Sequence, residues 1–451
     1  MPHSATPIRR RWSRLRAGPP VLAVVGLLLF SSEGSAQIGL PALPSLPVLQ
    51  PTQIVGANLQ SATEIVDPTA QALIDARVTA ARKLIRDNRA TIEADPNGAP
   101  ILRAEVVAYS PSVSALQQAM GAGFEVLRRQ TLEGLEAEIV VLRAPAEMTT
   151  RRALQRLRTL DPQGNYDYNH IYMESGAAGA DAAGQIPALT PAAPQADEPF
   201  DIGLIDGGLN TSHPALRSVR IASSGCNGAV IISAHGTAVA SLLVGEAPNF
   251  RGARPGASLL AIDVFCGLAT GGAADTVANA LALLVKKRVR IVNVSLVGPP
   301  NRLLEQVVRA VQERGVLIVA AVGNDGPAAP PLYPAAYPGV VAVTAVDARS
   351  RVLPEACRGA HVQFAAPGAE LIAANATGGY TRVRGTSFAA PIVAGLLSTL
   401  LDASGQDSAR ALQQLQLQAK DLGKPGRDPV YGFGYVGDSL LHNQQITPTA
   451  D

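Results

Sequence analysis

The sequence predicts an α/β protein in which a parallel sheet, covered by helices on both faces, follows a smaller α+β unit. After Pro199, near-continuous apolar runs alternate with segments of helical periodicity, a pattern typical of parallel strands buried on both faces. These runs are DIGLID, ASLLAIDVF, RIVNVSL, VLIVAAVG and VVAVTAV. With 451 residues, of which 47% are hydrophobic and 16% charged, the chain is long and apolar enough for at least two folded units.

The N-terminus has the layout of a secretory signal peptide. Five arginines precede the apolar run from Val21 to Phe30, and small residues follow it at positions 34–36. A membrane anchor is the alternative, but this run is shorter than the roughly 20 residues that cross a bilayer. We therefore expect residues 1–36 to be removed, the protein to reach a periplasm or the extracellular space, and no stable membrane insertion to remain.

Residues 37–99 are predicted to form a tether followed by a helix. The first part is rich in Pro and Leu and has no clear period. Helical spacing of apolar residues then begins at Pro68 and stops at the DPNG stretch 95–98. We interpret this helix as a packing element.

Residues 100–174 are predicted to form the smaller α+β unit. AEVVAYS predicts a strand, SVSALQQAMGAG a helix, FEVLRRQTL and LEAEIVVLRAP strands, TTRRALQRLRTL a helix, and NYDYNHIYM a strand. This βαββαβ order is typical of a ferredoxin-like unit. Residues 175–198 are low in charge and dense in Ala, Gly and Pro, which indicates a linker. The main domain then spans residues 199–440, and residues 441–451 form a tail.

Charge and cysteine content argue against several kinds of partner. The formal net charge of +2 favours neither a nucleic acid nor an anionic membrane surface. Three cysteines, none in a Cys-x-x-Cys pair, cannot build a four-thiolate metal site, and we expect neither a metal nor another cofactor. In an exported protein Cys226 and Cys266 are candidates for a disulfide, because both are expected in loops near one strand edge. Three buried thiols are the alternative.

Three polar residues of the main domain lie at the ends of apolar runs. Asp206 closes a strand before a Gly-Gly pair, whereas His235 and Ser387 each open an apolar helix. Singly, each has an ordinary explanation as a turn aspartate, a structural histidine or a capping serine. Together they offer the orienting carboxylate, the base and the hydroxyl that acyl transfer requires. Pro391 lacks an N–H, so we expect the Ser387 carbonyl to lack its helical partner and the first turn to stay open.

The order Asp, His, Ser is that of subtilisin and differs from the Ser, Asp, His order of α/β-hydrolases. Through LIDGGLNTSHPAL, HGTAVASLLVG, VAAVGNDGP and GTSFAAPIVAG, the segment from Pro199 to Leu440 resembles the subtilisin-like serine peptidases, or subtilases. The resemblance implies a subtilisin-like parallel sheet and hydrolysis of peptide or protein substrates through an acyl-enzyme on Ser387. It also implies that Asn324 is a side-chain donor to the oxyanion.

The same resemblance indicates where a substrate binds. Ser295, Leu296, Val297 and Gly298 match an extended segment that pairs with the substrate backbone. Val297 replaces a glycine of the family, and a branched side chain beside the cleft narrows the set of peptides that fit, so we expect a selective peptidase. Gly207 is a second departure, since the family usually has Thr or Ser after the aspartate.

Residues 100–174 resemble the inhibitory prodomain of these enzymes, which implies a zymogen whose own prodomain fills the cleft until a bond within residues 175–198 is cleaved. A permanent recognition domain is the alternative. Residues 247–257 offer too few carboxylates and carbonyls for the family's calcium loop, so we expect no tight calcium site there. Two rival functions are a catalytically silent peptide-binding protein on the subtilisin fold and an esterase of the α/β-hydrolase class.

Overall fold

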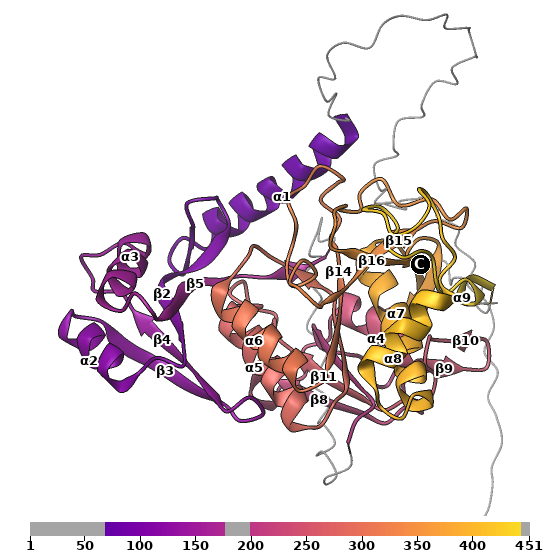
Figure 1. The fold of residues 1–451 in the computed structure, drawn as a ribbon, viewed down its shortest axis with the longest axis horizontal. Coiled ribbons are helices and arrows are strands. Elements are labelled where there is room, and N and C mark those ends of the chain that lie inside the picture. The colour runs from indigo at the N-terminus through magenta and orange to yellow at the C-terminus, as the bar shows by residue number, and fades with distance from the viewer. Residues whose placement is uncertain (1–67, 176–198, 443–451) are drawn as a thin grey trace, which may run out of the picture. The chain divides into compact units, whose positions relative to one another are not determined.

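The computed structural model describes residues 68–175 and 199–442 (Figure 1). The first described element is the helix α1 (Pro68–Asp87), in the region where the sequence predicts a helix. The predicted signal peptide, the first part of the tether, nearly all of the linker and most of the tail lie outside the described residues.

The N-terminal unit, residues 92–174, is built on an antiparallel sheet. Its first elements are β1 (Ile92–Ala94), β2 (Pro100–Tyr109), α2 (Val113–Gly121), β3 (Glu125–Leu132), β4 (Ala137–Arg143), α3 (Thr150–Leu160) and β5 (Asn165–His170). The strand order β5-β2-β4-β3 is that of a ferredoxin-like unit, and β1 adds a further antiparallel pairing with β2. Ser112 and Thr149 cap α2 and α3 through their side-chain oxygens. Leu116, Leu154 and Leu157 bury the apolar sides of these helices against one face of the sheet.

The main domain contains a parallel sheet of seven strands. These are β7 (Ile202–Asp206), β8 (Ile221–Gly225), β11 (Leu259–Asp263), β12 (Ile291–Val294), β14 (Leu317–Ala321), β15 (Val341–Val346) and β16 (Val362–Pro367). Their order is β16-β15-β14-β12-β7-β11-β8, and every neighbouring pair is parallel. The inner strands are buried on both faces, which is why their sequences are continuous apolar runs.

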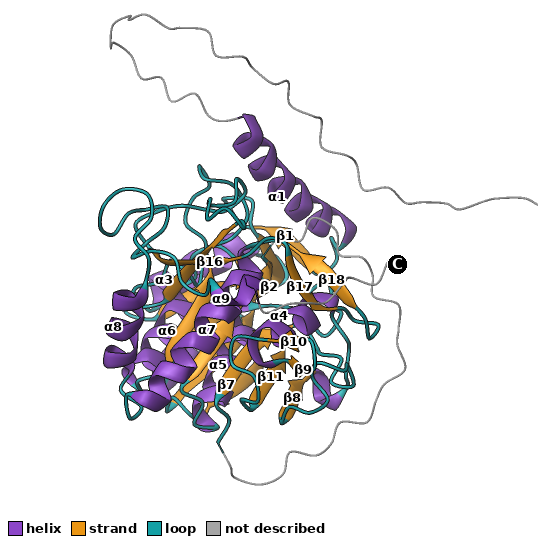
Figure 2. Cartoon of the chain, turned by 90° about the vertical axis from the view of Figure 1, so that its right-hand side faces the viewer, coloured by secondary structure: helices purple, strands orange, loops and turns teal. Residues whose placement is uncertain are grey.

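Helices cover both faces of the parallel sheet, as the sequence predicts. The five helices are α4 (Ala234–Val244), α5 (Ala274–Lys286), α6 (Arg302–Glu313), α7 (Thr386–Ala403) and α8 (Ser408–Gln418). Successive strand residues point to opposite faces, so in β14 Ile318 packs with α5 and α6, whereas Val319 packs with α4 and α7. Figure 2 shows α7 lying along the strands of this sheet. The two apolar clusters place the core on both sides of the sheet.

The second face of the N-terminal sheet packs on α5 and α6. Val107, Ile139 and Val141 from this sheet share one buried cluster with Leu281 of α5 and Val311 of α6. Figure 1 shows α5 and α6 between the two sheets. Helices and sheets therefore alternate in layers from α2 and α3, through the two sheets, to α4 and α7.

The remaining described elements are short. They are β6 (Met173–Glu174), the 3-10 turn η1 (Cys226–Gly228), β9 (Glu246–Ala247), β10 (Phe250–Arg251), β13 (Leu296–Val297), β17 (Leu371–Ala374), β18 (Tyr380–Val383) and α9 (Ser439–His442). Within the described ranges, α7 is the helix that has the length and apolar composition of a membrane span, but 67% of that stretch is buried inside the protein, as expected of a core helix.

Candidate active site

The carboxyl edge of the parallel sheet brings Asp206 and His235 together. β7 ends at Asp206, and α4 begins one residue before His235, with Ser233 as its N-cap. Asp206 Oδ1 lies 2.9 Å from His235 Nδ1 and also accepts a hydrogen bond of 2.7 Å from Gly207 N. His235 Nε2 is buried and has no hydrogen-bond partner among the described residues. A ring whose Nδ1–H is held by a carboxylate presents its Nε2 lone pair as a base.

The charge state of His235 depends on two carboxylates. Burial of the ring lowers its pKa, but the charge and hydrogen bond of Asp206 and the charge of Glu174 outweigh this effect and raise the pKa of His235 to about 9. Burial raises the pKa of Glu174; the charge of His235 opposes this rise, and Asp206 adds to it. A base must be neutral, so with Glu174 in place His235 becomes able to accept a proton as the pH rises to about 9.

Ser387 is the second residue of α7 and is fully buried. The helix begins after Gly385, whose φ of 138° favours glycine, and no side chain caps it. The capping alternative for Ser387 is therefore not observed. Pro391 cannot donate to the Ser387 carbonyl, which instead accepts a hydrogen bond of 3.0 Å from Ser295 Oγ.

The backbone carbonyl of Ser175 lies at the Ser387 hydroxyl. Ser387 Oγ donates to this carbonyl oxygen at 2.5 Å, and Ser175 N donates to Ser295 O at 3.2 Å. The Ser175 hydroxyl lies 3.2 Å from Thr386 Oγ1 and accepts a hydrogen bond of 3.3 Å from Asn324 Nδ2. Ser175 thus presents to Ser387 the type of group that a serine nucleophile attacks.

The residues before Ser175 form an extended strand that pairs with the main domain. β6 pairs antiparallel with β13, which lies within the predicted substrate-binding segment 295–298. Tyr172 N donates to Gly272 O at 2.8 Å. Residues 172–175 are therefore bound through backbone hydrogen bonds, as a peptide added to a strand edge would be.

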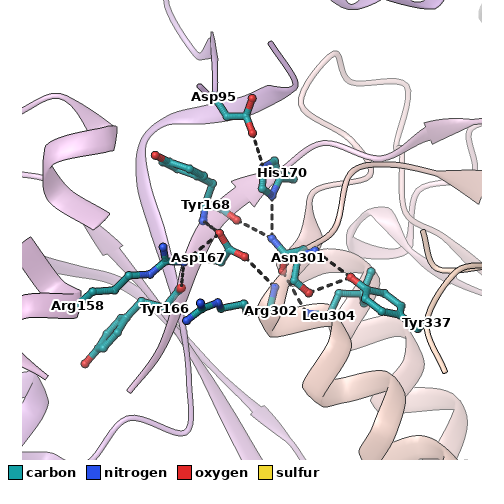
Figure 3. Close-up of polar contacts among 10 residues, drawn as sticks. All are labelled: Asp95, Arg158, Tyr166, Asp167, Tyr168, His170, Asn301, Arg302, Leu304 and Tyr337. Carbon is teal, nitrogen blue, oxygen red and sulfur yellow. Dashed lines mark hydrogen bonds and ion pairs between the residues drawn. The ribbon is translucent and has the colours of Figure 1, made fainter. Parts of the chain in front are cut away.

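A cluster of buried polar side chains connects β5 to the start of α6 (Figure 3). Asn301, the N-cap of α6, donates from Nδ2 to His170 Nδ1 at 2.9 Å. His170 Nε2 lies 3.3 Å from Asp95 Oδ2, and Asp167 accepts a hydrogen bond of 2.7 Å from Arg302 N. The N-terminal unit therefore contacts the main domain through specific polar groups as well as through apolar packing.

The structure brings the predicted residues to one edge of the sheet. Ser387 and Asn324 contact Ser175, and the segment 295–298 pairs with the strand that precedes it. The Asp206–His235 pair lies beside Glu174, and the His235 ring is 5.4 Å from the ring of Phe388. Three further residues of this region were not singled out from the sequence: Glu174, Ser175 and Ser233. Ser233 has the residue type and position of a helix N-cap, which is a signal that the sequence offers.

Cys226 and Cys266 form a disulfide, with their Cα atoms 5.2 Å apart. The bond joins the ends of β8 and β11, close to the turn that follows Asp206. In the described part of the chain, potential metal ligands group either around this disulfide or around His235, and not in residues 247–257.

An Asp–His pair and a serine at a helix N-terminus, all at the carboxyl edge of a parallel sheet, are the features of a serine hydrolase. The sequence profile of the Subtilase family matches residues 200–434, and the chain belongs to this family. Subtilisin DY of Bacillus licheniformis is 31% identical over 231 residues, which cover 49% of this chain and 84% of that protein. Minor extracellular protease Epr of Bacillus subtilis is 31% identical over 208 residues, 45% of this chain and only 32% of Epr.

Two solved structures share the fold. Fervidolysin from Fervidobacterium pennivorans, a keratinolytic enzyme related to subtilisin, has a TM-score of 0.61 at 18% identity and covers 77% of this chain and 62% of its own. The epidermin leader peptide processing serine protease of Staphylococcus aureus has a TM-score of 0.55 at 15% identity and covers 76% of this chain and 100% of its own. The likeness in fold thus extends beyond residues 200–434. Family and relatives place the chain among the serine endopeptidases, with the subtilisin fold.

Replacing Asn324 by alanine is expected to lower kcat about 10²- to 10³-fold with little change in KM. This scale is the one measured when an oxyanion donor is removed from a subtilisin. Asn324 Oδ1 also accepts a hydrogen bond of 3.0 Å from Thr386 N, so alanine removes this acceptor together with the expected donor. Asn324→Asp keeps the acceptor, removes the donor and adds a negative charge beside the oxyanion, so it should be at least as slow as the alanine variant. Steady-state kinetics should show both variants to be slow, and an Asp variant with normal kcat would contradict the donor role.

Proposed function

We propose that this chain is an exported endopeptidase, made as a zymogen, in which Asp206, His235 and Ser387 form the catalytic triad. Ser387 Oγ bonds to the carbonyl carbon of the substrate while its proton passes to His235 Nε2. The C–N bond then breaks, and His235 returns the proton to the leaving nitrogen. Water hydrolyses the acyl-enzyme through the same base. Asp206 holds the ring and stabilises its charged form.

The observation that carries the proposal is the Ser387 hydroxyl on the Ser175 carbonyl, with His235 Nε2 left without a partner. The His235 ring lies 5.4 Å from the ring of Phe388, the residue that follows Ser387. The hydroxyl is bonded to the carbonyl oxygen and not to the base, and such catalytic hydrogen bonds often tighten only in the reacting complex. The N-terminus of α7 supplies positive potential, and Asn324 Nδ2, which here donates to the Ser175 hydroxyl, supplies a donor that the oxyanion would need.

The N-terminal unit acts in this proposal as a prodomain that blocks the cleft in cis. Three features support this role: the pairing of β6 with β13, the position of Ser175, and the cluster around Asn301. Cleavage of the bond after Ser175, at the start of the predicted linker, would release the unit. A folded template also has a physical purpose, because a parallel sheet forms through non-local contacts and folds slowly.

Export is supported by the signal-like segment at residues 1–36 and by the disulfide, which is stable in oxidising compartments. The relatives include a minor extracellular protease and a major intracellular serine protease, both of Bacillus subtilis. The proposal of export therefore rests on this chain's own features. Selectivity is supported by Val297, which is buried and lies opposite Met173 in the pairing of β13 with β6.

A probe that reacts with activated serines tests the proposal. The full chain is incubated until its mass shows loss of the N-terminal unit, treated with a fluorophosphonate and analysed by peptide mapping. We expect one label, on Ser387, and none on Ser387→Ala or on heat-unfolded protein. A chain that is neither processed nor labelled would contradict the proposal and favour a silent peptide-binding protein.

A further inference from the structure

Glu174 places a carboxylate beside the Asp206–His235 pair. Its Oε1 accepts a hydrogen bond of 3.3 Å from Ser233 Oγ, and one ligand atom each of Glu174, Asp206 and His235 lie within 4.8 Å of one another. Ser233 is also the N-cap of α4, and the N-terminus of a helix attracts negative charge. Burial, Asp206 and the nearby Asp263 oppose ionisation of the Glu174 carboxyl, whereas a charged imidazole and the Ser233 hydroxyl favour it. The N-terminus of α4 also favours the ionised form.

Gly207 allows the close approach of Ser233, which donates a hydrogen bond to Glu174. A Cβ atom at this position would lie 2.5 Å from Ser233 Cβ and 3.6 Å from Glu174 Oε1. The glycine therefore lets Ser233 approach the end of β7, whereas 3.6 Å from Glu174 would be an ordinary contact. Gly207 thus acts on the subsite through Ser233, the hydrogen-bond donor of Glu174.

The site around the Ser175 side chain is small and polar. Ser175 is buried, and its hydroxyl contacts Thr386 and Asn324. Thr386 Oγ1 in turn accepts a hydrogen bond of 3.2 Å from Gly323 N. A Cβ atom at Gly323 would meet Leu332 Cδ1 at 2.5 Å, so Leu332 packs directly on the Gly323 backbone. Because Ser175 is buried and its hydroxyl contacts Thr386 and Asn324, we expect a small residue to fit here and a large one to be rejected.

Tyr172 is the third residue of the bound strand whose side chain contacts the main domain. Its side chain is fully buried, and its hydroxyl donates to Pro299 O at 2.8 Å. A Cβ atom at Gly298 would lie 2.5 Å from the Tyr172 ring, so the ring packs directly on the glycine backbone. A buried acceptor that loses its donor is costly, which favours tyrosine over phenylalanine.

On the basis of the proposed function, we propose that the enzyme selects extended peptides with the pattern Tyr-x-Glu-Ser and cleaves after the serine, as residues 172–175 present it. The recognised chemistry is a phenol at the fourth residue before the cleaved bond, a carboxylate at the second, and a small side chain at the first. The glutamate of the substrate also assists the transfer of the Ser387 proton to His235.

The substrate glutamate assists proton transfer because its attraction to His235 acts mainly in the transition state. The ring of His235 becomes positively charged only as it takes the proton of Ser387, so a nearby carboxylate stabilises the transition state more than the ground state. The same attraction contributes to the raised pKa of His235, so the imidazole loses its proton and becomes a base only at higher pH. Glutamine keeps the shape of glutamate and removes its charge. A glutamine peptide should therefore react more slowly at high pH, and the midpoint of its pH–rate profile should lie at a lower pH than that of the glutamate peptide.

Internally quenched peptides with the sequence of residues 168–180 test the inference on the self-processed full chain. Glu→Gln at position 174 should lower the high-pH kcat on the order of tenfold and shift the midpoint of the pH profile downward. Ser→Phe at position 175 should lower kcat/KM more than about 100-fold. Tyr→Phe at position 172 should mainly raise KM, and Met→Leu at position 173 serves as the control with little effect.

Variants of Ser233 distinguish a specific contact with the substrate glutamate from a general loss of activity. Ser233→Ala should reduce the preference for Glu over Gln, and Ser233→Thr, which retains the hydroxyl, should restore it. Equal kcat and equal pH midpoints for the Glu and Gln peptides would overturn the inference, as would cleavage at another bond. Labelling of Ser387 by the fluorophosphonate without this selectivity would overturn the inference and leave the proposed function intact. Absence of both labelling and cleavage would overturn the two together.

Discussion

Ser387→Ala is expected to leave the full chain whole and to reduce peptide turnover about 10⁶-fold, the scale measured for loss of the nucleophile in a subtilisin. The alanine removes the oxygen that contacts the Ser175 carbonyl, so no acyl-enzyme can form. The measurement is the intact mass of the natural chain and the variant, expressed with secretion side by side. The natural chain should lose everything up to Ser175 and begin at Gly176.

Ser398→Ala provides the matched control, because Ser398 is a buried serine of the same helix without a contact to Ser175. This variant should process itself as the natural chain does. Both variants should unfold cooperatively, as measured by thermal denaturation. A Ser387→Ala chain that loses its N-terminal unit when no other protease is present would show that Ser387 is not the nucleophile.

Asp206→Asn is expected to lower kcat about 10⁴-fold, the scale known for the corresponding change in another serine protease. An asparagine can donate to Nδ1 of His235 and thereby stabilise the tautomer that carries its proton on Nε2, where the base is needed. Asp206 also raises the pKa of His235, so the residual activity should rise at lower pH than that of the natural enzyme. The pH dependence of kcat for both proteins checks both effects.

Asp201→Asn is a suitable control, since Asp201 precedes β7 at its other end and accepts hydrogen bonds of 2.7 Å from the backbone and hydroxyl of Ser258. It should affect stability and leave kcat and its pH dependence unchanged. Full activity of Asp206→Asn would contradict the orienting role of the carboxylate.

The parallel sheet could be predicted from sequence because its inner strands are buried on both faces and are therefore continuously apolar. The ferredoxin-like order of the N-terminal unit could be predicted for a related reason, since two amphipathic helices separate its strands. β1 was missed because three residues with one fully buried side chain, Ile92, are too short to show a period. The hairpin of β17 and β18 is likewise short and was not predicted.

The candidate triad could be predicted because each member follows or opens an apolar element, and the carboxyl ends of parallel strands meet at one edge. The position of residues 172–175 beside this triad could not be predicted. Ser175 and Ser387 are 212 residues apart, and no local pattern in the sequence records a contact over that separation. The same holds for Glu174, whose neighbours Ser233 and His235 come from another unit of the chain.

Ser295 forms hydrogen bonds with both the bound strand and the proposed nucleophile. Its carbonyl accepts from Ser175 N, and its hydroxyl donates to Ser387 O while accepting a hydrogen bond of 2.9 Å from Asn293. We therefore expect a small shift of Ser295 to move the peptide and the serine in the same direction. Their alignment should then depend less on motions of the rest of the fold than that of two independently anchored groups.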